Sequence, residues 1–451
     1  MKAGWKTVKL GDIALVGAGN SAPQDDADFS TDGPCFVRTS DVGEVKFGTV
    51  NSSNDRLSSK GAKGMRLWKA GTILIPKSGA STFVNHRVIL GLDAHVSSHL
   101  ATIQAEPTRC DARYLLYYLS TVKAQDLIQD QSYPSLKLPE IAGIEIPLPQ
   151  LAEQKRIVAL LDEAFAGIDE AKAKAEVNIT HAGSDLFETI LESAMNGKLT
   201  EQWRNEHPKG ELASALLDKI LQKRRSNWAG NGPYQTPLEP DTESLPASPA
   251  QWTYATIEQL LRDDGALSYG ILKPGIPDPK GVPMVRVMDI GNGMVNDTDL
   301  MMVSKQLSDE YKRTTLEEDD IMLAVMATIG RCAIVPPHLV GANVNRALAV
   351  LKLSKLLHAQ FILFAILSPR IQNLFQMNKT GAAQARINLG DLRGYAIPLP
   401  PIAEQRVIIE KLKSLLSETR RLNDLYGQKM CALIELKQSL LAQAFAGELT
   451  A

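Results

Sequence analysis

The sequence predicts an α+β protein in which two tandem α/β domains, related by a pseudo-two-fold, are separated by a pair of long antiparallel coiled-coil helices. Three observations predict this architecture. The chain has 451 residues, 44% apolar and 22% charged, which suits a core-burying protein of about three folded segments. Two motifs recur in the same order at a nearly constant separation. A sustained heptad pattern also begins at each copy of the first motif.

The internal repeat is clearest at two places. IPLPQLAEQ at Ile146–Gln154 returns as IPLPPIAEQ at Ile397–Gln405, 251 residues later. LFETILESAMNGKLT at Leu186–Thr200 aligns with LKQSLLAQAFAGELT at Leu436–Thr450, at a separation of 250. Weaker matches join Trp5 to Trp252 and the segment 37–43 to 285–291. A fixed separation of this size indicates duplication of one large unit.

Each copy divides into an α/β domain and a long helix. Short alternating stretches such as Gly71–Pro76 are typical of strands, and we expect the Pro-Leu-Pro motif to end the strand before each long helix. The predicted segments are two α/β domains at 1–150 and 251–400, a central long helix at 151–204, a short helix with a Pro/Gly linker at 205–250, and a C-terminal long helix at 401–451.

The two long helices share one heptad register. Nine of thirteen a and d positions are apolar in each, which favours coiled-coil helices of about 65 Å that pair antiparallel. Gly183 is the expected weak point of the first helix. The residues expected to contact the other helix or a partner are Leu151, Val158, Leu161, Phe165, Ile168, Ile402, Ile409, Leu412, Leu416 and Leu433.

The net charge of −2 argues weakly against nucleic-acid binding, but most of the acid excess lies in residues 151–249. Residues 56–92 and 321–390 each hold seven basic side chains and no acidic one, a pattern that would suit phosphates; scattered solvated charges are the alternative. The candidate DNA contacts, with Gln384 and Arg386 as base readers, are Arg38, Lys60, Lys63, Arg66, Lys77, Arg87, Arg286, Arg331, Arg346, Lys379, Gln384 and Arg386.

Motifs for catalysis, metals and membranes are missing or weak. The sequence has no P-loop, no CxxC pair and no glutamate between His95 and His99, so we expect no catalytic residue, metal or cofactor in this chain. Asp278, Glu310 and Lys312 imitate a nuclease signature, which leaves a degenerate enzyme as a rival hypothesis. Without a long apolar run or a signal peptide, we expect a cytoplasmic protein that does not enter a membrane.

Three features of the chain form one pattern. They are two variable α/β domains, a helix start after each of them at Pro147–Gln154 and Pro398–Gln405, and a closing motif in each copy at Asn196–Arg204 and Ala444–Ala451. This pattern resembles the specificity subunit of type I restriction-modification systems over essentially the whole chain. The helix and closing motifs are fairly specific to that family, whereas the α/β domains vary with the target.

The resemblance implies a non-catalytic subunit that recognises a bipartite, asymmetric sequence in double-stranded DNA. Each α/β domain would be a target recognition domain reading one half-site, and the helix pair would set the gap. The resemblance also implies two methyltransferase subunits, which carry S-adenosylmethionine, and restriction-translocation subunits as partners. The alternative is a coiled-coil interaction scaffold whose α/β domains bind protein or RNA.

Overall fold

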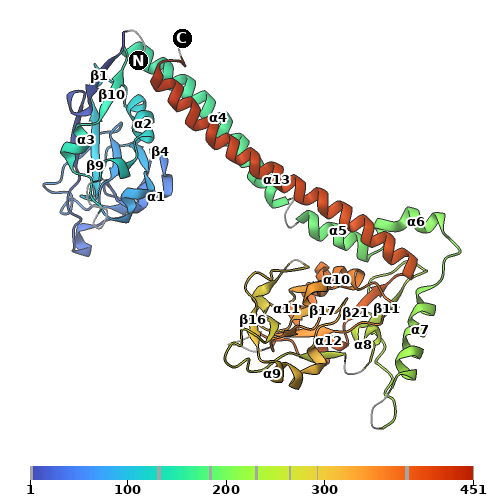
Figure 1. Cartoon of the computed structure of the whole chain (residues 1–451). Helices are drawn as coiled ribbons and strands as arrows, with labels where there is room; N and C mark the ends of the chain where they lie inside the picture. The colour runs from blue at the N-terminus through green and yellow to red at the C-terminus, as the bar shows by residue number, and fades with distance from the viewer. Residues whose placement is uncertain are drawn as a thin grey trace. The chain divides into compact units, whose positions relative to one another are not determined.

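The computed structural model describes residues 4–128, 134–181, 185–228, 232–263, 266–291, 293–380 and 385–449. The chain forms two compact units (Figure 1). The first unit comprises Met1–Glu176 and Tyr426–Ala451, and the second comprises Val177–Leu425. Each unit has its own sheets and hydrophobic core.

The first unit contains a five-stranded sheet in the order β2-β9-β6-β7-β4, a three-stranded sheet β5-β3-β8 and a ribbon β1-β10. Its strands are β1 (Lys6–Lys9), β2 (Ala14–Ala18), β3 (Cys35–Val37), β4 (Phe47–Val50), β5 (Asp55–Arg56), β6 (Ile73–Pro76), β7 (Arg87–Leu90), β8 (His95–Val96), β9 (Leu100–Ala105) and β10 (Glu145–Leu148). Its helices are α1 (Thr39–Val45), α2 (Ala112–Thr121), α3 (Leu138–Ala142) and nearly all of α4 (Leu151–Thr180).

The second unit contains a four-stranded sheet β12-β20-β17-β18, a three-stranded sheet β16-β13-β19 and the ribbons β11-β21 and β14-β15. Its strands are β11 (Thr253–Thr256), β12 (Leu267–Tyr269), β13 (Val282–Val285), β14 (Ile290–Gly291), β15 (Met294–Val295), β16 (Met301–Val303), β17 (Ile321–Ala324), β18 (Cys332–Ile334), β19 (Asn343–Val344), β20 (Leu348–Leu351) and β21 (Ala396–Leu399). Its helices are α5 (Leu186–Met195), α6 (Glu201–Glu206), α7 (Ala213–Ser226), α8 (Ile257–Leu260), α9 (Lys305–Glu310), α10 (Ala359–Leu367), α11 (Pro369–Met377), α12 (Leu389–Arg393) and the first half of α13 (Ile402–Ala446).

The duplication predicted from the sequence is confirmed by matching topology. In each unit the first and last strands form an antiparallel ribbon, with Lys6 opposite Leu148 in one and Thr253 opposite Leu399 in the other. Each three-stranded sheet contains one parallel pair, β3 with β8 and β13 with β19. The predicted fold class, two tandem α/β domains with long antiparallel helices, is therefore correct.

The second long helix is α13, a single helix of 45 residues. The first long helix comprises α4 and α5. Gly183, the predicted weak point, lies outside the described residues. Within the first unit α4 runs antiparallel to the end of α13, and within the second α5 runs antiparallel to its start (Figure 1).

The Pro-Leu-Pro motifs end the preceding strands as expected, at Leu148 and Leu399, directly before Pro149 and Pro400, although the first proline of each motif still lies within the strand. Pro147 lies inside β10 opposite Thr7, and Pro398 lies inside β21 opposite Tyr254. Each strand belongs to a two-stranded ribbon, so the missing proline N–H can lie on the unpaired side.

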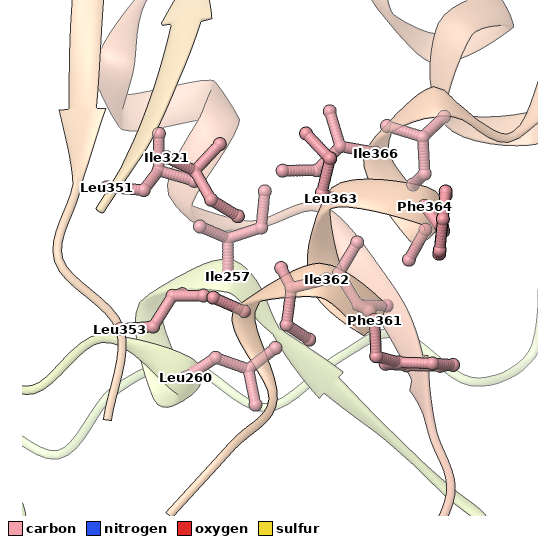
Figure 2. Close-up of a cluster of buried hydrophobic side chains, with 14 of the residues drawn as sticks. Ile257, Leu260, Ile321, Leu351, Leu353, Phe361, Ile362, Leu363, Phe364 and Ile366 are labelled. Atoms are coloured by element: carbon pink, nitrogen blue, oxygen red, sulfur yellow. The ribbon is translucent and has the colours of Figure 1, made fainter. Parts of the chain in front are cut away.

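The opening turns of each long helix are part of a domain core rather than of a helix seam alone. In the first unit Phe165 of α4 packs edge-on against Tyr117 of α2, with ring centroids 5.4 Å apart. In the second unit Leu412 of α13 shares a core with α10, where Phe361, Ile362 and Leu363 converge with side chains of α8, β17 and β20 (Figure 2). Most of the predicted seam residues are accordingly buried: Val158, Leu161, Phe165, Ile168, Ile409 and Leu412.

Candidate nucleic-acid interface

In the first unit three chain segments meet at the carboxyl end of the parallel pair β3–β8. Ser97 N–H donates to the carbonyl of Val37 over 2.9 Å, Asn20 N–H to that of Val96 over 2.8 Å, and Ser98 N–H to that of Asn20 over 2.7 Å. Glycine is required beside this junction, because a Cβ on Gly19 would lie 2.0 Å from the Val96 oxygen. The three segments are thus fixed by their backbones, and their side chains can vary.

The second unit repeats this junction bond for bond. Asn345 N–H donates to Val285 over 3.0 Å, Ile271 N–H to Val344 over 2.8 Å, and Arg346 N–H to Ile271 over 2.9 Å. A Cβ on Gly270 would lie 2.1 Å from the Val344 oxygen, so the glycine requirement is repeated as well.

Two further segments extend each junction through the next strand. In the first unit Lys77 N–H donates to His99, and Leu136 N–H donates to Lys77. In the second unit the same bonds join Val325 N–H to Ala347 and Ile387 N–H to Val325. We call these five segments the loop edge: residues 19–20, 38, 77–79, 97–99 and 134–136 in the first unit, and 270–271, 286, 325–327, 345–347 and 385–387 in the second.

Arg38 and Arg286 occupy the same place on the two loop edges and stabilise the local fold. Asp41 accepts a 2.6 Å bond from the backbone N–H of Arg38, and Asp289 accepts a 2.7 Å bond from that of Arg286. The Arg286 guanidinium also donates twice to Asp289, while that of Arg38 pairs with Asp55. Both arginines are predicted DNA contacts, and both already have carboxylate partners.

The other cations of the first unit that are predicted to contact DNA differ in whether an acidic side chain pairs with them. Lys60 forms ion pairs with Asp25 and Asp28, at 3.1 and 2.9 Å. Arg66 is exposed and lies over the Trp68 ring, 3.7 Å from its centroid. Lys63 is exposed and Lys77 is half-buried on the loop edge; among the described residues neither has an acidic partner.

Arg87 is not a surface contact, contrary to the prediction. Its side chain is buried, and its guanidinium donates to the carbonyls of Leu119, Val122 and His86 at 3.3, 3.2 and 2.9 Å. Burial lowers the pKa of Arg87 to about 10. This arginine satisfies carbonyls at the end of α2 and holds β7 against that helix, so it is unavailable to a phosphate.

Four predicted cations of the second unit are exposed: Arg331, Arg346, Lys379 and Arg386. Arg346 and Arg386 lie on the loop edge, and Lys379 donates to Gln376 over 3.0 Å. In the described parts of the chain none of the four has an acidic partner. Gln384, the other predicted base reader, lies outside the described residues.

Some basic side chains of the two acid-free stretches are neutralised, because acidic residues from other segments form ion pairs with them. Lys69 pairs with Asp93, just beyond the first stretch, at 2.8 Å. Lys352 is buried and pairs with Asp320 and Glu317, at 2.7 and 3.0 Å. Sequence order alone could not show these pairings, since the acids lie outside the stretches.

The repeated Glu-Gln pair at the helix starts is the feature that sequence reasoning left unexplained. Glu153 accepts a bond from the Trp5 indole over 3.2 Å, and Glu404 accepts one from that of Trp252 over 2.8 Å. Gln154 donates to Pro149 over 2.9 Å, as its repeat Gln405 does to Pro400 over 3.0 Å. The tryptophan bonds hold each long helix to the residue just before the first strand of its domain, and the glutamine bonds close the turn at the helix start. The matched tryptophans were the available signal in the sequence.

The remaining predicted contacts of the long helices are partly exposed. Leu151, Ile402, Leu416 and Leu433 are half-buried, and the last three pack against their domain cores. Helix α13 also carries exposed apolar side chains that the heptad analysis did not assign: Leu415, Leu422, Leu425, Ile434 and Leu436.

Weak metal and nuclease motifs have ordinary structural roles. The His95 ring bonds the Arg66 carbonyl over 3.0 Å, and the His99 ring bonds the Ser78 hydroxyl over 2.7 Å. Asp278 accepts a turn bond from the Lys280 N–H. Within the described ranges no group of three or more His, Cys, Asp and Glu side chains is placed to hold a metal ion. The described helices include none long and apolar enough to cross a membrane.

A family model described as the type I restriction modification DNA specificity domain matches residues 2–179 and 275–425, one copy in each half of the chain. The chain belongs to this family. The resemblance inferred from the sequence is therefore confirmed.

Named relatives and solved structures agree with membership of this specificity family. The chain is 27% identical to the type I restriction enzyme EcoBI specificity subunit of Escherichia coli, over 79% of this chain and 70% of the relative. It is 26% identical to the EcoKI specificity subunit of E. coli K12 over 68% of this chain, an alignment that spans only 58% of that relative.

Two solved structures share the fold over nearly the whole chain. A chain from a study of assembly and conformational transition of the type I R-M system superposes with a TM-score of 0.68, at 18% identity and 99% coverage of both chains. The HsdS subunit from Thermoanaerobacter tengcongensis superposes with a TM-score of 0.55, at 17% identity, over 100% of this chain and 98% of that one.

Proposed function

We propose that this chain is the non-catalytic DNA-specificity subunit of a type I restriction-modification complex and that it recognises a bipartite sequence in double-stranded DNA. The observation that carries the proposal is the pair of loop edges, which share their backbone bonds but differ in side chains. A shared scaffold with different side chains suits two different half-sites read by one chain.

Contacts to the phosphate backbone supply the sequence-independent part of such binding. Lys63, Arg66 and Lys77 are suited to this role in the first unit, and Arg331 and Lys379 in the second, because they are at least partly exposed and have no acidic partner among the described residues. These side chains would position the DNA, while contacts to base edges would select the sequence.

The long helices would serve as spacer and docking surface. A continuous 45-residue helix is about 68 Å long, which suits an element that separates two half-sites. The exposed apolar side chains of α13 suit burial by another protein. Because the chain repeats itself, we propose two equivalent sites for two methyltransferase subunits.

The partners would supply the chemistry of the complex. S-adenosylmethionine would bind in the methyltransferase subunits, and restriction-translocation subunits would join that core in the cytoplasm. The chain itself would bind, orient and space the DNA relative to the partners' active sites.

Competition binding tests this proposal against the alternative scaffold for protein or RNA. The full chain is assembled with its methyltransferase subunits on a labelled duplex, and unlabelled duplexes compete for it. We expect a duplex whose gap is altered by two base pairs to compete on the order of a thousandfold less well than the intact bipartite site. Equal competition by any sequence and any gap would contradict DNA recognition and favour the scaffold.

A further inference from the structure

The two loop edges separate residues that build the scaffold from residues that can read a sequence. Features common to both units have structural roles, namely the close-packed glycines Gly19 and Gly270 and the carboxylate-paired arginines Arg38 and Arg286. An exposed residue that differs between the units at the same backbone position has no such shared role. Such positions are where each unit can select its own bases.

Two of these positions change from serine in the first unit to arginine in the second. The backbone bonds match Ser98 with Arg346, since each donates to the segment that holds Gly19 or Gly270. The residue before Leu136 is Ser135, and the residue before the matching Ile387 is Arg386.

Arg346 and Arg386 are placed to act together on one stretch of DNA. Both are exposed, and neither has an acidic partner in the described ranges. Val325 bonds to both of their segments, its N–H donating to the carbonyl of Ala347 and its carbonyl accepting from the N–H of Ile387.

The side chain of Asn345, next to Arg346, also indicates that a ligand binds at this place. The side-chain oxygen of Asn345 is buried and has no hydrogen-bond partner among the described residues. A buried acceptor without a donor is costly, and most are satisfied. The matching Ser97 instead accepts a bond from His99 N–H. An acceptor left open at this place fits a surface completed by a ligand that carries donors.

We propose that Arg346 and Arg386 are base-reading residues that each specify a guanine in the half-site bound by the second unit. Arginine donates two bonds to O6 and N7 of guanine in the major groove, a pattern that no other base presents. The inference rests on the proposed function. It adds that the first unit, with Ser98 and Ser135 at these positions, has no guanine reader of this kind there.

The test is selection from a duplex library by the full chain assembled with its methyltransferase subunits, followed by sequencing of the bound DNA. We expect Arg346→Ala and Arg386→Ala each to reduce the preference for guanine at one position of one half-site, by on the order of tenfold to a hundredfold. The other half-site should be unchanged. Arg346→Gln should move the preference at its position from guanine to adenine, because glutamine pairs with adenine N6 and N7.

Arg225→Ala is the matched control, since Arg225 is exposed at the end of α7 and outside the loop edge. It should leave the selected bases unchanged. Equal weakening of all sequences by the Arg346 and Arg386 variants, or loss of a base other than guanine, would overturn the assignment. If the parent complex selects no half-site at all, the proposed function fails instead, so the two failures are distinguishable.

Discussion

Glu404 shows how a single residue holds a long helix to its domain. Its fully buried carboxylate accepts bonds from the Trp252 indole at 2.8 Å, the Thr200 hydroxyl at 2.6 Å and the Arg204 guanidinium at 2.7 Å. The repeated sequence identifies Glu404 as important but not its partners, because Thr200 and Arg204 lie two hundred residues away.

We predict that Glu404→Ala destabilises the second unit by roughly 3 kcal/mol, because the partly buried Arg204 loses its carboxylate partner and the Trp252 indole and Thr200 hydroxyl lose their acceptor. The measurement is the urea midpoint followed by tryptophan fluorescence. Glu404→Gln should lose less, since the amide oxygen can still accept. Glu418→Ala is the control: this exposed residue of α13 pairs only with Arg421 at 3.5 Å, and its loss should shift stability by less than about 0.5 kcal/mol. An equal effect of both alanine variants would refute the role of Glu404.

Arg87 and Lys63 belong to the same set of predicted DNA contacts, but Arg87 has a structural role whereas Lys63 is a proposed DNA contact. Arg87→Ala should destabilise the first unit by about 2–3 kcal/mol, because three carbonyls lose their donor. Lys63→Ala should leave stability unchanged and weaken binding to all DNA sequences alike. Urea unfolding and binding assays with each variant check both statements. A stable Arg87→Ala protein that binds DNA weakly would reverse the assignment.

Acid stability of the second unit should depend on Glu317. Hydrogen bonds from Arg262 and then Lys352 lower the pKa of Glu317 to about 2, from an ordinary value of 4.5. The unfolded state therefore binds more protons between these values, so this contribution is present above pH 4.5 and is lost as the pH falls toward 2. Burial raises the pKa of neighbouring Asp320, which acts in the opposite direction.

We accordingly predict that Glu317→Gln flattens the fall in urea midpoint between pH 4.5 and pH 2. Glu310→Gln, at the exposed end of α9, should retain the slope of the parent protein. A slope that does not change in Glu317→Gln would mean that another carboxylate dominates acid unfolding.

At the scale of elements, periodicity predicted the long helices and the repeat located their starts at Leu151 and Ile402. It did not predict that Phe165 and Leu412 enter domain cores. Heptad positions report which residues are apolar, but not whether a helix or a sheet covers them. The loop edges could not be predicted either. Their segments lie far apart in the sequence and are joined by backbone hydrogen bonds, which leave no pattern of side chains in the sequence.

The proposed spacer role of the helices gives a prediction at the scale of elements. Deleting residues 170–176 of α4 together with residues 430–436 of α13 removes one heptad from each helix of the first unit, near the level where Asp169 faces Lys437. Seven residues span about 10 Å, so the preferred gap should shorten by about two to three base pairs while the bases read stay the same. Library selection measures both quantities. Changed bases with a constant gap would contradict the spacer.

For the whole molecule, the net charge of −2 is a poor guide to function. The excess of acidic side chains lies in the sequence segment 151–249. Some basic side chains of the acid-free stretches form ion pairs with acids outside those stretches, as Lys352 does with Asp320. What remains on the loop edge of the second unit is a small set of unpaired cations, including Arg346 and Arg386. Under the proposed function, duplication would give one chain two DNA-reading units on one scaffold.

Methylome sequencing tests this account most directly. The chain is expressed in cells together with its methyltransferase subunits, and every modified adenine is mapped. The account predicts modification within one asymmetric bipartite sequence whose two halves are separated by a constant gap. Modification at a single contiguous sequence, at halves separated by a variable gap, or without any sequence preference would contradict it.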